Sequence, residues 1–207
     1  SKRLGSLSLG ELRDSGIEPM SLNSLIARLG TADSVEPVQD MPTLIAGFDI
    51  TRLGRAPARF DAEDVTRLNA RILHDMPYQA AVARLTEMNA PEGAAFWDSV
   101  KGNLTLFKDV ADILHLIKGP VTPVIEADDA DYVSAALAAL PQGELTVESW
   151  SEWTQSLKES TGRKGRALFM PLRQALTGQA HGPEMQHLLP LIGYDKAVAR
   201  LQGKTGG

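Results

Sequence analysis

The chain of 207 residues contains no cysteine. This absence excludes disulfide bonds, thiolate nucleophiles and zinc sites built from cysteine ligands. The chain has only four histidines, and none is spaced as in the His-x-x-x-His or His-Glu-x-x-His motifs of metal sites. We therefore expect no zinc and no other bound metal, and we interpret the histidines as ordinary surface or core residues.

Long hydrophobic runs are also missing. No stretch approaches the roughly 18 apolar residues that a membrane-spanning helix needs, and the first residues lack the apolar segment of a secretory signal. With 43% hydrophobic and 23% charged residues, the composition is ordinary for a globular protein. We expect one large or two small domains, a cytoplasmic location and no membrane partner.

Complete catalytic motifs are missing as well. The sequence has neither a Gly-x-x-x-x-Gly-Lys-Ser/Thr phosphate loop nor a Gly-x-Ser-x-Gly nucleophile elbow. Asp128, Asp129 and Asp131 have no base at the spacing of a catalytic pair. We interpret them as the start of a helix, where carboxylates complement the helix dipole. We expect no complete catalytic site within the chain.

Charge is unevenly distributed along the sequence. The net charge of −5 argues by itself against a nucleic-acid-binding protein. Acidic residues gather from Glu126 to Asp131, however, whereas basic residues gather from Arg163 to Arg173. Because a phosphate backbone responds to the local field, the basic segment keeps RNA binding open.

Hydrophobic periodicity predicts a mainly α fold. In the helix expected over 63–75, Val65, Leu68, Ile72 and Leu73 share one face, with Asp61 as the N-cap. Residues 49–60 are expected to form a short irregular hairpin. We predict three parts: a small α-rich module with the hairpin (1–60), and two all-helical subdomains (61–122 and 123–207). The other expected helices are 12–15, 21–29, 38–46, 78–89, one beginning at Pro91, 104–117, 129–140, 147–159, 161–176, 183–191 and 194–202.

A basic turn precedes the helix that ends near Gly178. Arg163, Lys164 and Arg166 alternate with glycines, which let a backbone approach closely, and the helix N-terminus adds partial positive charge. Arg173 follows on the same helix, and its planar fork of donors could hydrogen-bond a base edge. A solvated basic turn and a salt-bridged surface arginine are equally compatible with these residues.

The turn at Gly182 and Pro183 lies between two expected helices. Such turns expose backbone N–H and C=O groups that can hydrogen-bond an unstacked base, which is how single-stranded RNA loops are usually recognised. Trp97, Trp150 and Trp153 could offer stacking surfaces, but we interpret them as core anchors.

One long string resembles a known family. Residues Gly165 to Gly178 read Gly-Arg-Ala-Leu-Phe-Met-Pro-Leu-Arg-Gln-Ala-Leu-Thr-Gly. This string is similar to the C-terminal signature of bacterial glutamyl-tRNA synthetases, which continues with Gly-Pro and a Leu-Leu-x-Leu-Gly-like segment. Here Gly182-Pro183 and Leu188 to Gly193 follow. At the start, Ser1-Lys2-Arg3 resembles the end of the Lys-Met-Ser-Lys-Ser-type loop, so the resemblance covers essentially the whole chain in order.

The resemblance implies a division of labour. Residues 1–60 would form the stem-contact module of a glutamyl-tRNA synthetase, and the rest would form the helical cage that grips the anticodon. Ser1, Lys2 and Arg3 would belong to the ATP-binding loop, and the nucleotide-binding half would lie outside these 207 residues. ATP and Mg²⁺ would serve the full-length ligase, with neither bound here. We expect binding of tRNA(Glu) without aminoacylation, a monomer, and no DNA partner.

The resemblance also implies roles for single residues. Arg173 falls on an arginine near the anticodon, and Gly182, Pro183 and Met185 fall on the turn that holds the middle anticodon base. Gly102, with Lys101 beside it, falls where strictly discriminating enzymes place an arginine facing the third anticodon base. Our hypothesis is a non-discriminating enzyme that also accepts tRNA(Gln).

Two alternatives stay open at this point. Bulk acidity and the missing catalytic motifs are compatible with an all-helical adaptor module for protein partners and without an RNA role. A glutaminyl-tRNA synthetase is the other alternative, but its anticodon region is built from β-barrels, against which the helical periodicity argues.

Overall fold

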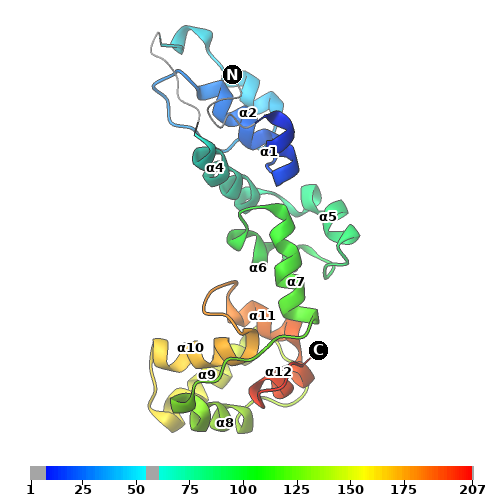
Figure 1. The fold of residues 1–207 in the computed structure, drawn as a ribbon, viewed down its shortest axis with the longest axis vertical. Helices are drawn as coiled ribbons and strands as arrows, with labels where there is room; N and C mark the ends of the chain where they lie inside the picture. Colours follow the sequence, from blue (N-terminus) through cyan, green and yellow to red (C-terminus); the bar gives the residue numbers. More distant parts are fainter. Residues whose placement is uncertain (1–7, 55–60, 207) are drawn as a thin grey trace. The chain divides into compact units, whose positions relative to one another are not determined.

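The computed structural model describes residues 8–54 and 61–206. They form two compact units, the first ending at Val110 and the second beginning at Ala111 (Figure 1). The described residues contain helices and no strand, which confirms the mainly α fold class. None of these helices is long and apolar enough to cross a membrane. The division into three parts stays a prediction.

The helices of the two units follow one another along the chain. Helix α7 (Val110–Lys118) begins at the last residue of the first unit and continues into the second. The first unit contains α1 (Leu9–Ser15), α2 (Pro19–Arg28), α3 (Met41–Ala46), η1 (Ile50–Arg52), α4 (Ala62–Asp75), α5 (Tyr78–Glu87), α6 (Ala94–Val100), η2 (Lys101–Asn103) and η3 (Phe107–Asp109). The second contains η4 (Ala127–Asp129), α8 (Ala130–Ala138), α9 (Val147–Thr161), α10 (Arg166–Thr177), α11 (Met185–Ile192) and α12 (Tyr194–Leu201).

Helix α4 organises the first unit. Its four predicted core residues are all buried, and Asp61 caps its start by accepting a hydrogen bond from the Glu63 N–H at 2.8 Å, as predicted. Asn69 is fully buried on the same helix. Its Oδ1 accepts from the Glu18 N–H at 2.7 Å and its Nδ2 donates to the Thr105 carbonyl at 2.7 Å. One amide therefore ties α4 to two distant segments.

The expected hairpin over 49–60 is not observed in its described half. Residues Ile50–Arg52 form a turn of 3₁₀ helix, because the Asp49 carboxylate accepts from the Thr51 N–H at 2.9 Å and curls the chain locally. Beyond that turn, the Gly54 N–H donates to the Gly30 carbonyl at 2.7 Å. Residues 55–60 lie outside the described residues.

In the second unit, α11 packs against α9, and α10 packs against α8, α9 and α12 (Figure 1). Trp153 on α9 is 1% exposed and its indole N–H donates to the Ala136 carbonyl at 2.9 Å, as expected of a core anchor. The segment that precedes η4 also belongs to this unit, since the Val124 N–H donates to the Gln174 carbonyl at 3.1 Å.

Gly178 ends α10 with φ +68°, and a Cβ there would lie 2.6 Å from the Thr122 carbonyl oxygen. Only glycine fits this contact.

Pro171 lies inside α10 and removes one backbone donor from the helix. The Ala167 carbonyl, which a residue at that position would normally satisfy, instead accepts from Arg163 Nη1 at 3.2 Å. One residue later, the Leu168 carbonyl accepts from the Tyr132 hydroxyl at 2.7 Å. Burial raises the pKa of Tyr132 to about 12, so its hydroxyl stays protonated as a donor. Side chains thus support α10 around its proline.

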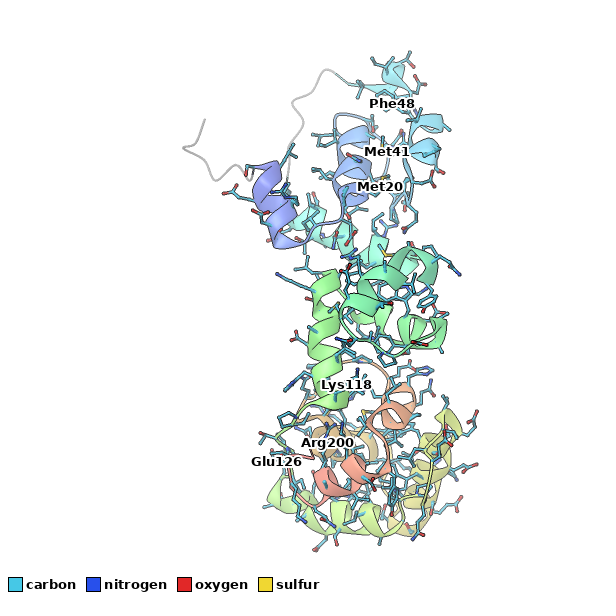
Figure 2. All side chains as sticks on the ribbon, turned by 90° about the vertical axis from the view of Figure 1, so that its right-hand side faces the viewer. Met20, Met41, Phe48, Lys118, Glu126 and Arg200 are labelled. Carbon is cyan, nitrogen blue, oxygen red and sulfur yellow. The ribbon has the colours of Figure 1, made fainter. Side chains whose placement is uncertain are left out.

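Two cations on α12 cap the ends of other helices. Arg200 is fully buried, and it donates to the Leu176 carbonyl at 2.9 Å and to the Gly119 carbonyl at 3.0 Å. Figure 2 labels it within the second unit. Lys196, one turn earlier, donates to the Ile117 carbonyl at 3.3 Å. These carbonyls are helix-end acceptors without helical partners, and α12 therefore holds the C-terminal ends of α7 and α10.

Candidate functional site

A pocket of about 480 Å³ opens on the second unit, within the range of small-molecule sites. Three helices contribute: α9, α10 and α11. The pocket combines two aromatic rings, a guanidinium, a thioether and two polar side chains at the start of α11. Its lining residues are Trp150, Phe169, Arg173, Glu184, Met185 and Gln186.

Arg173 is the cation of this pocket. Its Nη2 donates to the Pro183 carbonyl at 2.7 Å, whereas its Nη1 is buried and has no hydrogen-bond partner within the described residues. Burial lowers the pKa of the Arg173 guanidinium, but an arginine keeps its charge at neutral pH. The pocket therefore contains a fixed cationic donor that lacks an acceptor.

The turn before α11 approaches Arg173 directly. Gly182 has φ +135°, and a Cβ there would lie 3.5 Å from Arg173 Nη1. Pro183 and Met185 are buried, and the exposed Glu184 carboxylate accepts from Gln186 Nε2 at 2.7 Å. Four residues singled out in the sequence, Arg173, Gly182, Pro183 and Met185, are thus brought together. Of the four basic residues singled out in the segment 163–173, Arg173 is the one that contacts the inter-helix turn directly.

A second pocket of about 490 Å³ lies along α10, and Arg166 lines it together with Met170 and Gln174. Arg166 and its neighbour Lys164 are exposed, and neither forms an ion pair within the described part of the chain. Both cations are available to phosphates. The remaining lining residues are Asp129, Ala167, Pro171 and Ala180.

The other basic residue of this turn, Arg163, has partners within the protein. It forms an ion pair with Asp129 and lies over the Tyr132 ring, with its Cζ 4.2 Å from the ring centroid. Together with its bond to Ala167, these contacts give it a structural role. Its expected contact with tRNA stays a prediction, because the contacts seen here neither require nor exclude it.

The remaining predicted site residues lie elsewhere. Lys101 and Gly102 belong to the first unit, where Lys101 Nζ forms an ion pair with Asp98 at 2.8 Å and Gly102 is exposed. Ser1, Lys2 and Arg3 lie outside the described residues. In residues 8–54 and 61–206, no group of three or more His, Asp or Glu side chains is placed to hold a metal ion.

Sequence reasoning missed three residues of the pocket, Phe169, Glu184 and Gln186, and Phe169 is the aromatic one among them. It is 44% exposed and lies four residues before Arg173 on α10. That spacing puts both side chains on one face of the helix, so the sequence contained a usable signal.

Comparison with known proteins points to one family. The family model described as anticodon binding domain matches residues 76–204. A protein named glutamate–tRNA ligase 1 from Maricaulis maris is 53% identical over 206 residues, which are 99% of this chain and 46% of that protein. A second ligase of that name, from Parvibaculum lavamentivorans, is 53% identical over 198 residues, 96% of this chain and 44% of that protein. The chain thus spans less than half the length of these relatives.

Solved structures have the same fold. The crystal structure of a glutamate tRNA ligase from Elizabethkingia meningosepticum matches with a TM-score of 0.75 and 22% identity, covering 92% of this chain and 41% of that one. The family model and the Maricaulis maris ligase confirm the resemblance to glutamyl-tRNA synthetases, and the adaptor alternative is not favoured. The family model matches more than half of the residues of this chain, and the chain therefore belongs to the anticodon-binding domain family.

Proposed function

We propose that the helices from residue 61 onward bind the anticodon loop of tRNA(Glu), and that the whole protein is a glutamate–tRNA ligase. The observation that carries this proposal is the buried Arg173 Nη1, which has no acceptor within the described residues. Leaving a buried donor unpaired costs about 1–3 kcal/mol. A carbonyl or ring nitrogen of an unstacked RNA base would supply the acceptor.

The whole protein would need more than these residues. ATP and Mg²⁺ would serve the activation of glutamate in the nucleotide-binding half, and Lys2, with Ser1 and Arg3, would stabilise charge on ATP there. In this proposal the described helices contribute the binding of tRNA. For this role we propose a monomeric protein in the cytoplasm. Charging of tRNA would require the whole protein.

Phosphate binding by Lys164 and Arg166 gives a testable salt dependence. The logarithm of the tRNA association constant falls linearly with the logarithm of the salt concentration. Removal of one cation that binds a phosphate should reduce the steepness of this dependence by about 0.7–0.9. The Lys164→Ala/Arg166→Ala variant should therefore bind tRNA(Glu) more weakly at low salt and with a shallower slope, by about 1.5. Fluorescence anisotropy with labelled tRNA at several salt concentrations measures this slope.

The matched control removes two other exposed lysines of the same unit, Lys158 and Lys204. The control variant carries the same change in net charge and should keep the slope of the unchanged chain. Equal slopes for both double variants would contradict the assignment of Lys164 and Arg166 to phosphates.

We further propose that Gly102 leaves the enzyme non-discriminating. A glycine offers no donors for the third anticodon base, and the neighbouring Lys101 is already paired with Asp98. We expect similar affinities for tRNA(Glu) and tRNA(Gln). A Cβ at Gly102 would have no neighbour within 4 Å, so an arginine fits there.

The Gly102→Arg variant should gain a preference for tRNA(Glu) of about tenfold, because a guanidinium fork discriminates bases by about 1–3 kcal/mol. Gly102→Ala, which adds a side chain without donors, is the control and should keep equal affinities. A strong preference for tRNA(Glu) in the unchanged chain would refute the proposal.

A further inference from the structure

Three aromatic rings lead from the core of the second unit to its surface. The Trp153 ring is buried and meets the Trp150 ring edge-on, with ring centroids 5.7 Å apart. Trp150 in turn lies against Phe169 in a tilted arrangement, with centroids 6.2 Å apart. Both spacings are typical of favourable aromatic pairs. Exposure rises along this series from 1% to 9% to 44%, so its outer ring faces solvent.

The exposed end of this series is unusual within its unit. Among the described residues from 111 to 206, the large hydrophobic side chains that are strongly exposed are Val147 and Phe169. Val147 lies three residues before Trp150 on α9, which places it on the same side of that helix. The apolar surface of this unit is therefore concentrated beside the aromatic series.

The charges around Phe169 indicate what covers it. Phe169 and Arg173 line the same pocket, and Arg173 contributes a buried cationic donor without an acceptor. Lys164 and Arg166 near the start of the same helix form no ion pair within the described residues. An occupant with a flat π face, hydrogen-bond acceptors and negative charge nearby fits all three features, and an unstacked nucleotide has all of them.

We propose that Phe169 is a stacking residue, on which one unpaired base of the bound RNA continues the series Trp153–Trp150–Phe169. This inference rests on the proposed function, because it names how one residue of the same pocket holds the RNA. The stacked base excludes water from the ring, and the edge of that base or of its neighbour comes within reach of Arg173. Trp150 keeps the Phe169 ring in place and does not itself need to touch RNA.

The test compares Phe169→Leu with the unchanged chain. Leucine keeps an apolar side chain at an exposed position but removes the π face. Binding is measured by fluorescence anisotropy to a hairpin RNA with the anticodon loop of a glutamate tRNA, and to hairpins in which each anticodon base in turn is replaced by an abasic site. We expect Phe169→Leu to bind the intact hairpin about tenfold more weakly, the scale of one base–aromatic stack.

For one of the abasic hairpins, the unchanged chain and Phe169→Leu should have equal affinities, because the base missing from that hairpin is the one that stacks on Phe169. Phe169→Tyr should restore tight binding of the intact hairpin. The control is Ile45→Ala, which removes an exposed apolar side chain, 66% exposed, from the first unit and should change nothing. Thermal unfolding of each variant verifies that it folds.

Two results would overturn the stacking proposal while leaving the proposed function in place. The first is that Phe169→Leu binds the intact hairpin as tightly as the unchanged chain. The second is that it loses the same factor on every abasic hairpin. If the unchanged chain binds neither these hairpins nor tRNA(Glu) at low salt, the proposed function fails, and the stacking proposal fails with it.

Discussion

Replacement of Arg173 by methionine is expected to weaken binding of tRNA(Glu) by about 10- to 100-fold, the range for loss of one or two charge-assisted hydrogen bonds. Two effects add up. The variant loses the donor that Nη1 offers to the RNA, and it loses the Nη2 bond to Pro183 that fixes the turn before α11. Methionine keeps the apolar stem, so the pocket wall remains filled.

Arg173→Lys separates charge from geometry. A lysine keeps the cation but cannot donate to Pro183 and to a base at once through a planar fork. We therefore expect it to bind almost as weakly as Arg173→Met, with the salt slope of the unchanged chain, because a base contact releases few counterions. Wild-type affinity in Arg173→Lys would show that only charge matters there, and wild-type affinity in Arg173→Met would remove the residue from the site.

Replacement of Arg200 by alanine should have the largest effect on stability, a loss of about 3–5 kcal/mol for the second unit. The change leaves the Leu176 and Gly119 carbonyls without their donors and opens a cavity in the core. Removing a buried cation also relieves a desolvation cost. That relief is partial, since burial lowers the pKa of Arg200 without neutralising it.

Urea unfolding, followed by tryptophan fluorescence, measures this loss, because two of the three tryptophans, Trp150 and Trp153, belong to the second unit. Arg200→Met should lose less, about 2 kcal/mol, since its side chain refills most of the cavity. The control Arg67→Ala removes an exposed, ion-paired arginine from α4 and should stay within about 0.5 kcal/mol of the unchanged chain. An unfolding midpoint of Arg200→Ala equal to that of the control would contradict the capping role of α12.

The sequence could predict most of the helices and part of the site. Helical periodicity placed Val65, Leu68, Ile72 and Leu73 in the core, and all four are buried. The resemblance placed Arg173 beside the turn at Gly182 and Pro183, and the bond to the Pro183 carbonyl confirms that proximity. Ten residues separate Arg173 from Pro183, and their spacing alone could not have predicted the bond, which depends on how the chain turns after Gly178.

Tertiary contacts determine what the sequence could not predict. Arg163, Lys164 and Arg166 look equivalent in the sequence, yet Arg163 alone meets an acidic partner, Asp129, from a segment 34 residues away. One difference is local: the hairpin expected over 49–60 is replaced at Ile50–Arg52 by a turn of 3₁₀ helix, which the Asp49 carboxylate stabilises. The exposure of Phe169 likewise depends on how α9 and α10 pack, which periodicity does not reveal.

The central claim is that one pocket, formed by Phe169, Arg173 and the turn from Gly182 to Met185, holds unstacked RNA bases. The most direct test is an NMR titration of the isotope-labelled 207-residue chain with the anticodon hairpin of tRNA(Glu). We predict chemical-shift changes concentrated at Phe169, at the Arg173 side chain and at the backbone of 182–186. Saturable binding that shifts other residues and leaves this pocket unchanged would contradict the claim.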